Sequence, residues 1–231
     1  MARFEVLERE GQFYVRCVLD DETVRTEAGA LYFMRGDLRM ESKNPGLGGV
    51  LKAFASGESV FRPTYTGTGE LFLEPSFGGF HVLELDGGAW ILESGAYFAS
   101  EAGVSVDVHR EQTLTALRSG EGLVDFQTRV SGRGRVVLAT PGPVEETRLD
   151  GERMVVDGRY VLAREATVAY SAGRATRSLV GTVTSGEGLV RTYEGRGRLL
   201  MAPIPYWRKR LIDAVGAASR AGSAGGLASW L

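Results

Sequence analysis

The chain has 231 residues, a net charge of −2 and 43% apolar residues, so it is long and apolar enough to bury a core. Its 32 glycines follow no three-residue period, which excludes collagen, and the ordinary apolar content excludes a disordered chain. A single cysteine, Cys17, excludes an internal disulfide and a zinc site made of cysteines. Cys17 lies in an apolar, strand-like run, where we expect a buried and unreactive thiol.

The charges are distributed unevenly along the chain. Residues 1–126 contain 11 Lys and Arg against 20 Asp and Glu, a net charge of −9, and residues 127–231 contain 16 against 9, a net charge of +7. This asymmetry favours head-to-tail self-association or a partner with an anionic surface. A well-solvated exterior without any partner explains it equally well.

The first residues indicate a cytoplasmic location by elimination. Residues 1–5 are charged and contain no apolar signal region. No apolar stretch of the chain approaches the roughly 18 residues that a membrane span requires.

In chain order, the predicted elements form one unit that occurs three times. Each unit contains a glycine leading into an apolar run, a Ser-Gly-Glu tripeptide, a Gly-x-Gly tripeptide and an apolar strand. In the first unit, approximately residues 1–75, these are 29–33, 56–58, 67–69 and 71–73. In the second, approximately 76–141, they are 95–98, 119–121, 132–134 and 136–138. In the third, approximately 142–205, they are 158–162, 185–187, 195–197 and 199–201.

The recurring motif predicts the fold. Its structural core is the Ser-Gly pair, at Ser56 and Gly57, Ser119 and Gly120, and Ser185 and Gly186. Apolar runs between glycines are typical of β-strands joined by turns, and we expect Gly-x-Gly to make a tight turn into the closing strand. We therefore predict one all-β domain over residues 1–205, made of three tandem repeats related by pseudo-threefold symmetry.

The glutamate of each Ser-Gly-Glu tripeptide has two interpretations. The favoured one is a carboxylate that accepts hydrogen bonds from the backbone of its own turn, worth about 1 kcal/mol. The alternative is a calcium or magnesium site, because pseudo-threefold symmetry would bring three carboxylates together. The residues concerned are Glu58, Glu121 and Glu187.

Residues 206–231 lie outside the repeats and predict a short C-terminal helix. Pro203 and Pro205 end the last strand, and apolar residues then fall on one helical face at Trp207, Leu211, Val215 and Ala218. We favour a helix that packs on the β domain. The alternative is a tail that binds a partner subunit or makes peripheral contact with an anionic membrane.

The motifs resemble those of the AIM24 family, also called DUF124. The resemblance lies in residues 27–31, in residues 47–59 and in the recurrent Gly-Glu-Gly-Leu-Val with its downstream Gly-x-Gly, and it covers roughly residues 1–205. It implies a three-repeat β fold similar to that of the trp RNA-binding attenuation protein (TRAP). Eukaryotic members are mitochondrial and linked to inner-membrane organisation, whereas bacterial members have no settled activity. Because the chain has no mitochondrial transit peptide, it resembles the bacterial type.

The residues that enzymes use are sparse, and the family offers no catalytic residue to carry over. The two histidines, His81 and His109, lie in unrelated positions of the repeats and outside any metal-binding motif. No Gly-x-Ser-x-Gly elbow occurs, and residues 46–49 lack the ending of a phosphate-binding loop. We predict a protein that is not an enzyme and binds no cofactor.

Nucleic-acid binding is the main alternative. Two of the three Gly-x-Gly tripeptides present cations that could contact phosphates, at Arg133, Arg135, Arg196 and Arg198. The first copy has Thr68 and Glu70 instead, and the overall acidity also counts against phosphate binding. The predicted function is thus a non-enzymatic scaffold or protein-interaction module that forms a homo-oligomer or binds an unknown protein. The alternative is an RNA- or small-ligand-binding protein resembling TRAP.

Overall fold

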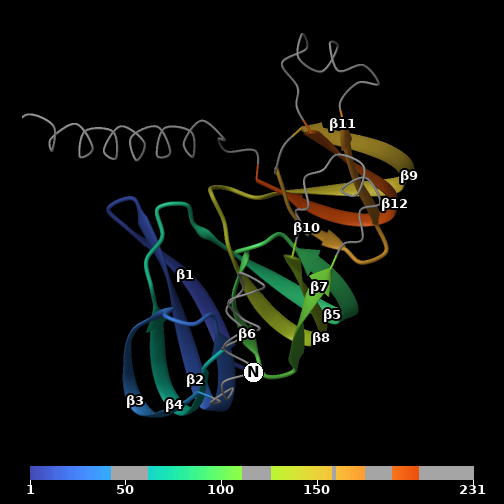
Figure 1. The fold of residues 1–231 in the computed structure, drawn as a ribbon. Coiled ribbons are helices and arrows are strands. Elements are labelled where there is room, and N and C mark those ends of the chain that lie inside the picture. The colour runs from blue at the N-terminus through green and yellow to red at the C-terminus, as the bar shows by residue number, and fades with distance from the viewer. Residues whose placement is uncertain (43–61, 111–125, 158–159, 175–188, 203–231) are drawn as a thin grey trace, which may run out of the picture.

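The computed structural model describes residues 1–42, 62–110, 126–157, 160–174 and 189–202, which form twelve β-strands and no helix (Figure 1). Every strand pairing among these residues is antiparallel, so the predicted all-β class is confirmed. No helix in this part of the chain is long and apolar enough to cross a membrane. The three Ser-Gly-Glu tripeptides and the predicted C-terminal helix lie outside the described residues.

The strands follow one another in three consecutive groups of four, coloured blue to teal, green to olive, and yellow to orange in Figure 1. The first group contains β1 (Arg3–Arg9), β2 (Gln12–Thr26), β3 (Leu31–Glu41) and β4 (Thr64–Leu73). The second contains β5 (Phe80–Leu92), β6 (Tyr97–Glu101), β7 (Val104–Arg110) and β8 (Phe126–Ala139). The third contains β9 (Glu145–Asp157), β10 (Val161–Glu165), β11 (Ala169–Arg174) and β12 (Leu189–Met201).

Each group is built around its last strand. β4 pairs with β2 and β3, β8 pairs with β5, β6 and β7, and β12 pairs with β9, β10 and β11. β1 is an addition to the first group and forms a hairpin with β2. The strand order β11-β12-β10-β5-β8-β6-β2-β4-β3 places the three groups in a row (Figure 1).

The Gly-x-Gly tripeptides lie inside β4, β8 and β12, so the prediction that they form turns is wrong. Their six glycines all have positive φ, between 103° and 157°. A Cβ on Gly67 would lie 2.1 Å from the carbonyl oxygen of Asp37, and a Cβ on Gly134 would lie 2.8 Å from the carboxylate of Glu101. Glycine is required at these points because the neighbouring strand leaves no room for a side chain.

Opposite each Gly-x-Gly, the longest strand of the group that pairs with it, β2, β5 or β9, contains a β-bulge. The pairing register shifts there in all three groups. One residue of each bulged segment has positive φ: Asp21 at 53°, Gly87 at 84° and Gly151 at 106°. Because a bulge bends a strand and increases its twist, these shifts curve the long strands around the apolar core.

The described residues contain three clusters of buried apolar side chains, of which two combine side chains of neighbouring groups and one lies within the third group. The cluster around Leu19 and Leu71 of the first group includes Ala99 and Val137 of the second. The cluster around Trp90 and Leu138 includes side chains of the third group, Leu162, Ala163 and Leu200. The hydrophobic effect therefore holds the groups to one another as well as stabilising each of them.

Candidate functional site

Two strand pairings between groups, here called the internal junctions, join the row together. At each one, the end of the long bulged strand of one group, β2 or β5, pairs with a short strand of the next group, β6 or β10. The first internal junction pairs β2 with β6, as Val24–Glu101, Arg25–Ser100 and Thr26–Ala99. The second pairs β5 with β10, as Trp90–Glu165, Ile91–Arg164 and Leu92–Ala163.

Backbone hydrogen bonds extend both internal junctions at equivalent places. At the first, the N–H of Glu27 donates to the carbonyl oxygen of Phe98 at 2.8 Å, and the N–H of Ala102 donates to that of Thr23 at 3.2 Å. At the second, the matching bonds are Glu93 to Leu162 at 2.9 Å and Ala166 to Ala89 at 2.8 Å. The two junctions thus share one register.

A glutamate from the short strand and an arginine from the Gly-x-Gly strand meet at each internal junction. Glu101 accepts the backbone N–H of Arg135 at 2.8 Å, and Glu165 accepts the backbone N–H of Arg198 at 3.1 Å. In the first group the two charges are exchanged: the arginine lies on β3 and the glutamate lies on the Gly-x-Gly strand, β4. Arg35 on β3 forms an ion pair with Glu70 on β4, and the pKa of Glu70 is lowered by hydrogen bonds from Arg35 and then from Arg16.

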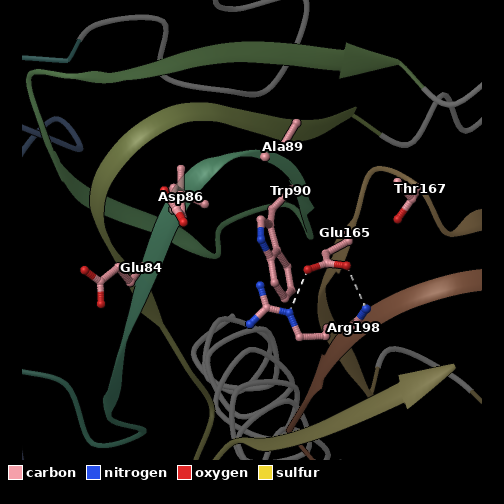
Figure 2. A pocket seen from close by; sticks show the side chains of 9 residues that line it. Glu84, Asp86, Ala89, Trp90, Glu165, Thr167 and Arg198 are labelled. Carbon is pink, nitrogen blue, oxygen red and sulfur yellow. Dashed lines mark hydrogen bonds and ion pairs between the residues drawn. The ribbon is translucent and has the colours of Figure 1, made fainter.

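A pocket of about 260 Å³ lies at the second internal junction, and Figure 2 shows its side chains converging around Trp90. Arg198 Nε donates to Glu165 Oε1 at 2.6 Å, and the guanidinium lies 5.1 Å from the centre of the Trp90 ring. Two further carboxylates, Glu84 and Asp86, line the pocket. Arg198 is the only cation among the described residues of the lining, and it is already held by a carboxylate and an aromatic ring, so it is not free to bind an anionic ligand.

A buried ion pair lies beside the same junction. Arg191 of β12 donates to Glu93, which follows β5, and the two side chains are only 9% and 10% exposed. Burial by itself lowers the pKa of Arg191, but the charge of Glu93 and its hydrogen bond raise the pKa overall. The guanidinium therefore remains charged, and the pair links the second group to the third.

The arginines predicted to contact anions occupy two kinds of position. Arg133 and Arg196 are 81% exposed, and they lie 3.6 and 3.5 Å from the carboxylates of Asp86 and Asp150. Arg135 and Arg198 are less exposed, and Arg135 Nη1 donates to the carbonyl oxygen of Ala2 at 3.3 Å. Each of these side chains already has an oxygen partner within its own chain.

The groups considered for catalysis or metal binding are not gathered into a site in the described part of the chain. Cys17 is fully buried, as expected, and burial raises the pKa of its thiol, which keeps it protonated. Burial lowers the pKa of His81. No cluster of three His, Cys, Asp or Glu side chains suited to a metal occurs among the described residues, and the predicted carboxylates, Glu58, Glu121 and Glu187, lie outside them.

Five strands have a single partner among the described residues, namely β1, β3, β7, β9 and β11, and two of them, β3 and β9, are the counterparts of strands that pair at the internal junctions. Among the described residues, β3 pairs only with β4, and β9 pairs only with β12. We call residues 31–36 the β3 edge and residues 153–157 the β9 end. Tyr32, Phe33 and Met34 of the β3 edge are 62%, 43% and 40% exposed, and Val155 of the β9 end is 47% exposed. Unpaired apolar edges of this kind are typical of interaction surfaces.

Comparison with protein families matches residues 4–204 to the family described as "Mitochondrial biogenesis AIM24". The chain belongs to the AIM24 family. The resemblance inferred from its motifs is thereby confirmed. Comparison with curated proteins gave no match.

A solved bacterial structure has the same fold as this AIM24-family chain. It is the crystal structure of protein SPYM3_0169 from Streptococcus pyogenes, which is 22% identical in sequence. The TM-score is 0.72, and the match covers 95% of this chain and 99% of the other. At this level of identity, the likeness concerns the fold alone.

The sequence of this AIM24-family chain led us to expect self-association through exposed strand edges, charge-complementary surfaces or the tail, or a small ligand between repeats, but it did not identify the residues of the β3 edge, the β9 end or the pocket. A signal for the β3 edge was present in the run Tyr32-Phe33-Met34. The segment that pairs in the same way in the second group has the small residues Ala99 and Ser100 instead. The pocket gave no local signal, because Trp90 and Arg198 are 108 positions apart in the sequence.

Proposed function

We propose that this protein is a non-enzymatic scaffold, built from three copies of one structural unit, that associates with further copies of itself. The observation that carries the proposal is the pair of segments with one free side among the described residues, the β3 edge in the first group and the β9 end in the third. The units correspond to approximately residues 1–75, 76–141 and 142–205.

Equivalent backbone contacts in the three groups support the triplication. After its Gly-x-Gly strand, each group has a backbone N–H that donates at 2.8 Å to a carbonyl oxygen before its short strand. These bonds run from Glu74 to Ala30, from Ala139 to Ala96 and from Ala202 to Tyr160. The positive φ of Asp21, Gly87 and Gly151 at equivalent points of the bulge is a second correspondence, independent of the first.

The character of the two ends supports self-association. An unpaired strand edge offers a row of backbone N–H and C=O groups to any extended segment that reaches it. Four of the nine exposed large apolar side chains among the described residues belong to β3: Tyr32, Phe33, Met34 and Met40. The net charges of −9 in residues 1–126 and +7 in residues 127–231 favour contact between the N-terminal part of one chain and the C-terminal part of another over contact between like parts.

The chemistry of the pocket supports a role other than catalysis. Its described polar groups are carboxylates, a threonine hydroxyl and an arginine that is already bonded to Glu165. Covalent catalysis needs a nucleophile activated by a neighbouring base or by a lowered pKa. The thiol of Cys17 is instead buried, with a raised pKa.

RNA binding has weaker support than self-association. The two most exposed of the predicted arginines, Arg133 and Arg196, each face an aspartate across the strand pair. Such acidic neighbours reduce the local positive potential on which phosphate binding depends. We therefore keep self-association as the proposed function.

Size-exclusion chromatography with light scattering tests the proposal on the full chain. We expect a mass greater than that of one chain at micromolar concentration. A strictly monomeric protein over this range would contradict self-association. The same measurement at low and at high salt separates two causes of association. If the copies associate at low salt and come apart at high salt, which screens the charges, then charge and not the strand edges holds them together.

A further inference from the structure

Under the proposed triplication, the long strands β2, β5 and β9 are equivalent to one another, as are β3, β6 and β10. The two internal junctions pair β2 with β6 and β5 with β10. One strand of each kind is left over, namely β9 in the third unit and β3 in the first. Among the described residues, the first and third units therefore carry the two halves of a third junction that does not form within the chain.

The exposure of equivalent side chains shows what each half lacks. Ile91 is 3% exposed inside the second internal junction, whereas Val155, at the equivalent position of β9, is 47% exposed. Leu162 is 7% exposed inside that junction, whereas its equivalent in β3, Tyr32, is 62% exposed. The same positions are thus covered at the second internal junction, half-buried at the first, and exposed in β9 and β3.

We infer that the β9 end of one chain pairs with the β3 edge of the next chain in the register of the internal junctions, and this rests on the proposed self-association. That register places Met154 opposite Arg35, Val155 opposite Met34 and Val156 opposite Phe33 of the neighbouring chain. The occupant of each edge is therefore a second copy of this protein, joined as its own units are joined.

The chemistry of the two segments fits this register. The central pairs bring valine against methionine and valine against phenylalanine, so the junction covers Val155, Met34 and Phe33, which are exposed in a single chain, whereas Val156 is already buried. By analogy with the internal junctions, the N–H of residue 157 donates to the carbonyl oxygen of Tyr32, and the N–H of Gly36 donates to that of Arg153. Arg35 brings no unpaired charge to the junction, because it forms an ion pair with Glu70 of its own chain.

The contact is heterologous, because the β9 end and the β3 edge are different surfaces. Each chain that joins occupies one free end and supplies one of the same kind, so an open assembly always has one β3 edge and one β9 end, and growth ends only when these two meet. Such a contact produces closed rings or open filaments. It does not produce a symmetric dimer in which two identical edges pair with each other.

Two single substitutions, Met34→Glu and Val155→Glu, block one end each. Both side chains are exposed in the chain, so we expect both variants to fold, with far-UV circular dichroism like that of the parent protein. Each variant alone should have the mass of one chain at micromolar concentration. Val108→Glu on β7 is the matched control, because Val108 is 41% exposed outside both ends and its substitution should leave the assembly unchanged.

Mixing the two variants tests the direction of the contact. The Met34→Glu chain keeps its β9 end and the Val155→Glu chain keeps its β3 edge, so the mixture should form a 1:1 dimer with twice the mass of one chain. A Val155→Glu variant that still assembles like the parent protein would overturn this pairing while leaving self-association intact. A parent protein that is itself monomeric would instead remove the proposed function.

A cysteine pair provides an independent measurement of the register. Residues directly opposite in an antiparallel pair have Cα atoms about 4.5–5.5 Å apart, within the range of a disulfide. Oxidation of a mixture of Met34→Cys and Val155→Cys chains should give mainly the mixed 34–155 dimer. The native Cys17 is buried and should not compete. A product dominated by 34–34 or 155–155 dimers would overturn the inference.

Discussion

Replacing Gly67 by alanine tests whether the close approach of β3 to β4 governs the stability of the first group. Gly67 has φ of 132°, and a Cβ at this position would lie 2.1 Å from the carbonyl oxygen of Asp37. A non-glycine residue at positive φ costs about 1–2 kcal/mol. Forcing an extra carbon into a filled space adds about 1–3 kcal/mol. We therefore expect Gly67→Ala to lower the free energy of unfolding by about 2–5 kcal/mol.

Gly11→Ala is the matched control for this substitution. Gly11 also has positive φ, 75°, but a Cβ there would meet no atom within 4 Å, so we expect a loss of only about 1–2 kcal/mol. Urea unfolding followed by circular dichroism measures both variants, at one protein concentration because association changes apparent stability. Equal losses for the two variants would refute the reasoning, since backbone conformation alone would then account for the requirement for glycine.

Three further expectations concern charged and titratable groups. Arg191→Ala leaves Glu93 buried without its cation, so it should lower the free energy of unfolding, measured in urea, by about 3–5 kcal/mol. Arg153→Ala removes a partner from an ion pair that is mostly exposed, so it should lower the same free energy by less than about 1 kcal/mol. Because burial lowers the pKa of His81, its contribution to stability is present above the ordinary pKa of about 6.5 and is lost as the pH falls. His81→Gln should therefore flatten the pH dependence of unfolding between about pH 7 and 5, and an unchanged profile would contradict this. In filter binding across a salt series, we expect no salt-sensitive affinity for RNA. An affinity that falls steeply as salt rises would instead favour RNA binding if it also disappears when four arginines are replaced by alanine, namely Arg133, Arg135, Arg196 and Arg198.

The strand content and the family could be predicted from the sequence because both are recorded in short motifs. Apolar runs bounded by glycines mark β4, β8 and β12, and the same spacing identifies the family. The role of Gly-x-Gly was predicted wrongly for a physical reason. Positive φ permits a turn, but it also permits a bend within a strand where a neighbour approaches closely, and only the position of that neighbour decides between them. The 2.1 Å from a Cβ on Gly67 to Asp37 is a tertiary distance with no local signal.

The candidate interaction surface was harder to foresee than the strands. An apolar run such as Tyr32-Phe33-Met34 has the composition of a buried strand, and the sequence alone does not tell whether a neighbour covers it. Its exposure becomes visible only when the order of the strands leaves β3 at the end of the row. The charge asymmetry favoured self-association or an anionic partner, with a solvated exterior as an equal alternative, and it could not identify any surface that would take part.

The reversed ion pair in the first group has a consequence for how the chain folds. A protein made of similar pieces risks exchanging strands between those pieces during folding. If β3 paired with β8 in place of β4, the guanidinium of Arg35 would lie beside that of Arg135, and β6 paired with β4 would bring together the carboxylates of Glu101 and Glu70. Like charges at these positions repel each other, so the reversal penalises both mispaired arrangements and steers the N-terminal strands towards their native partners.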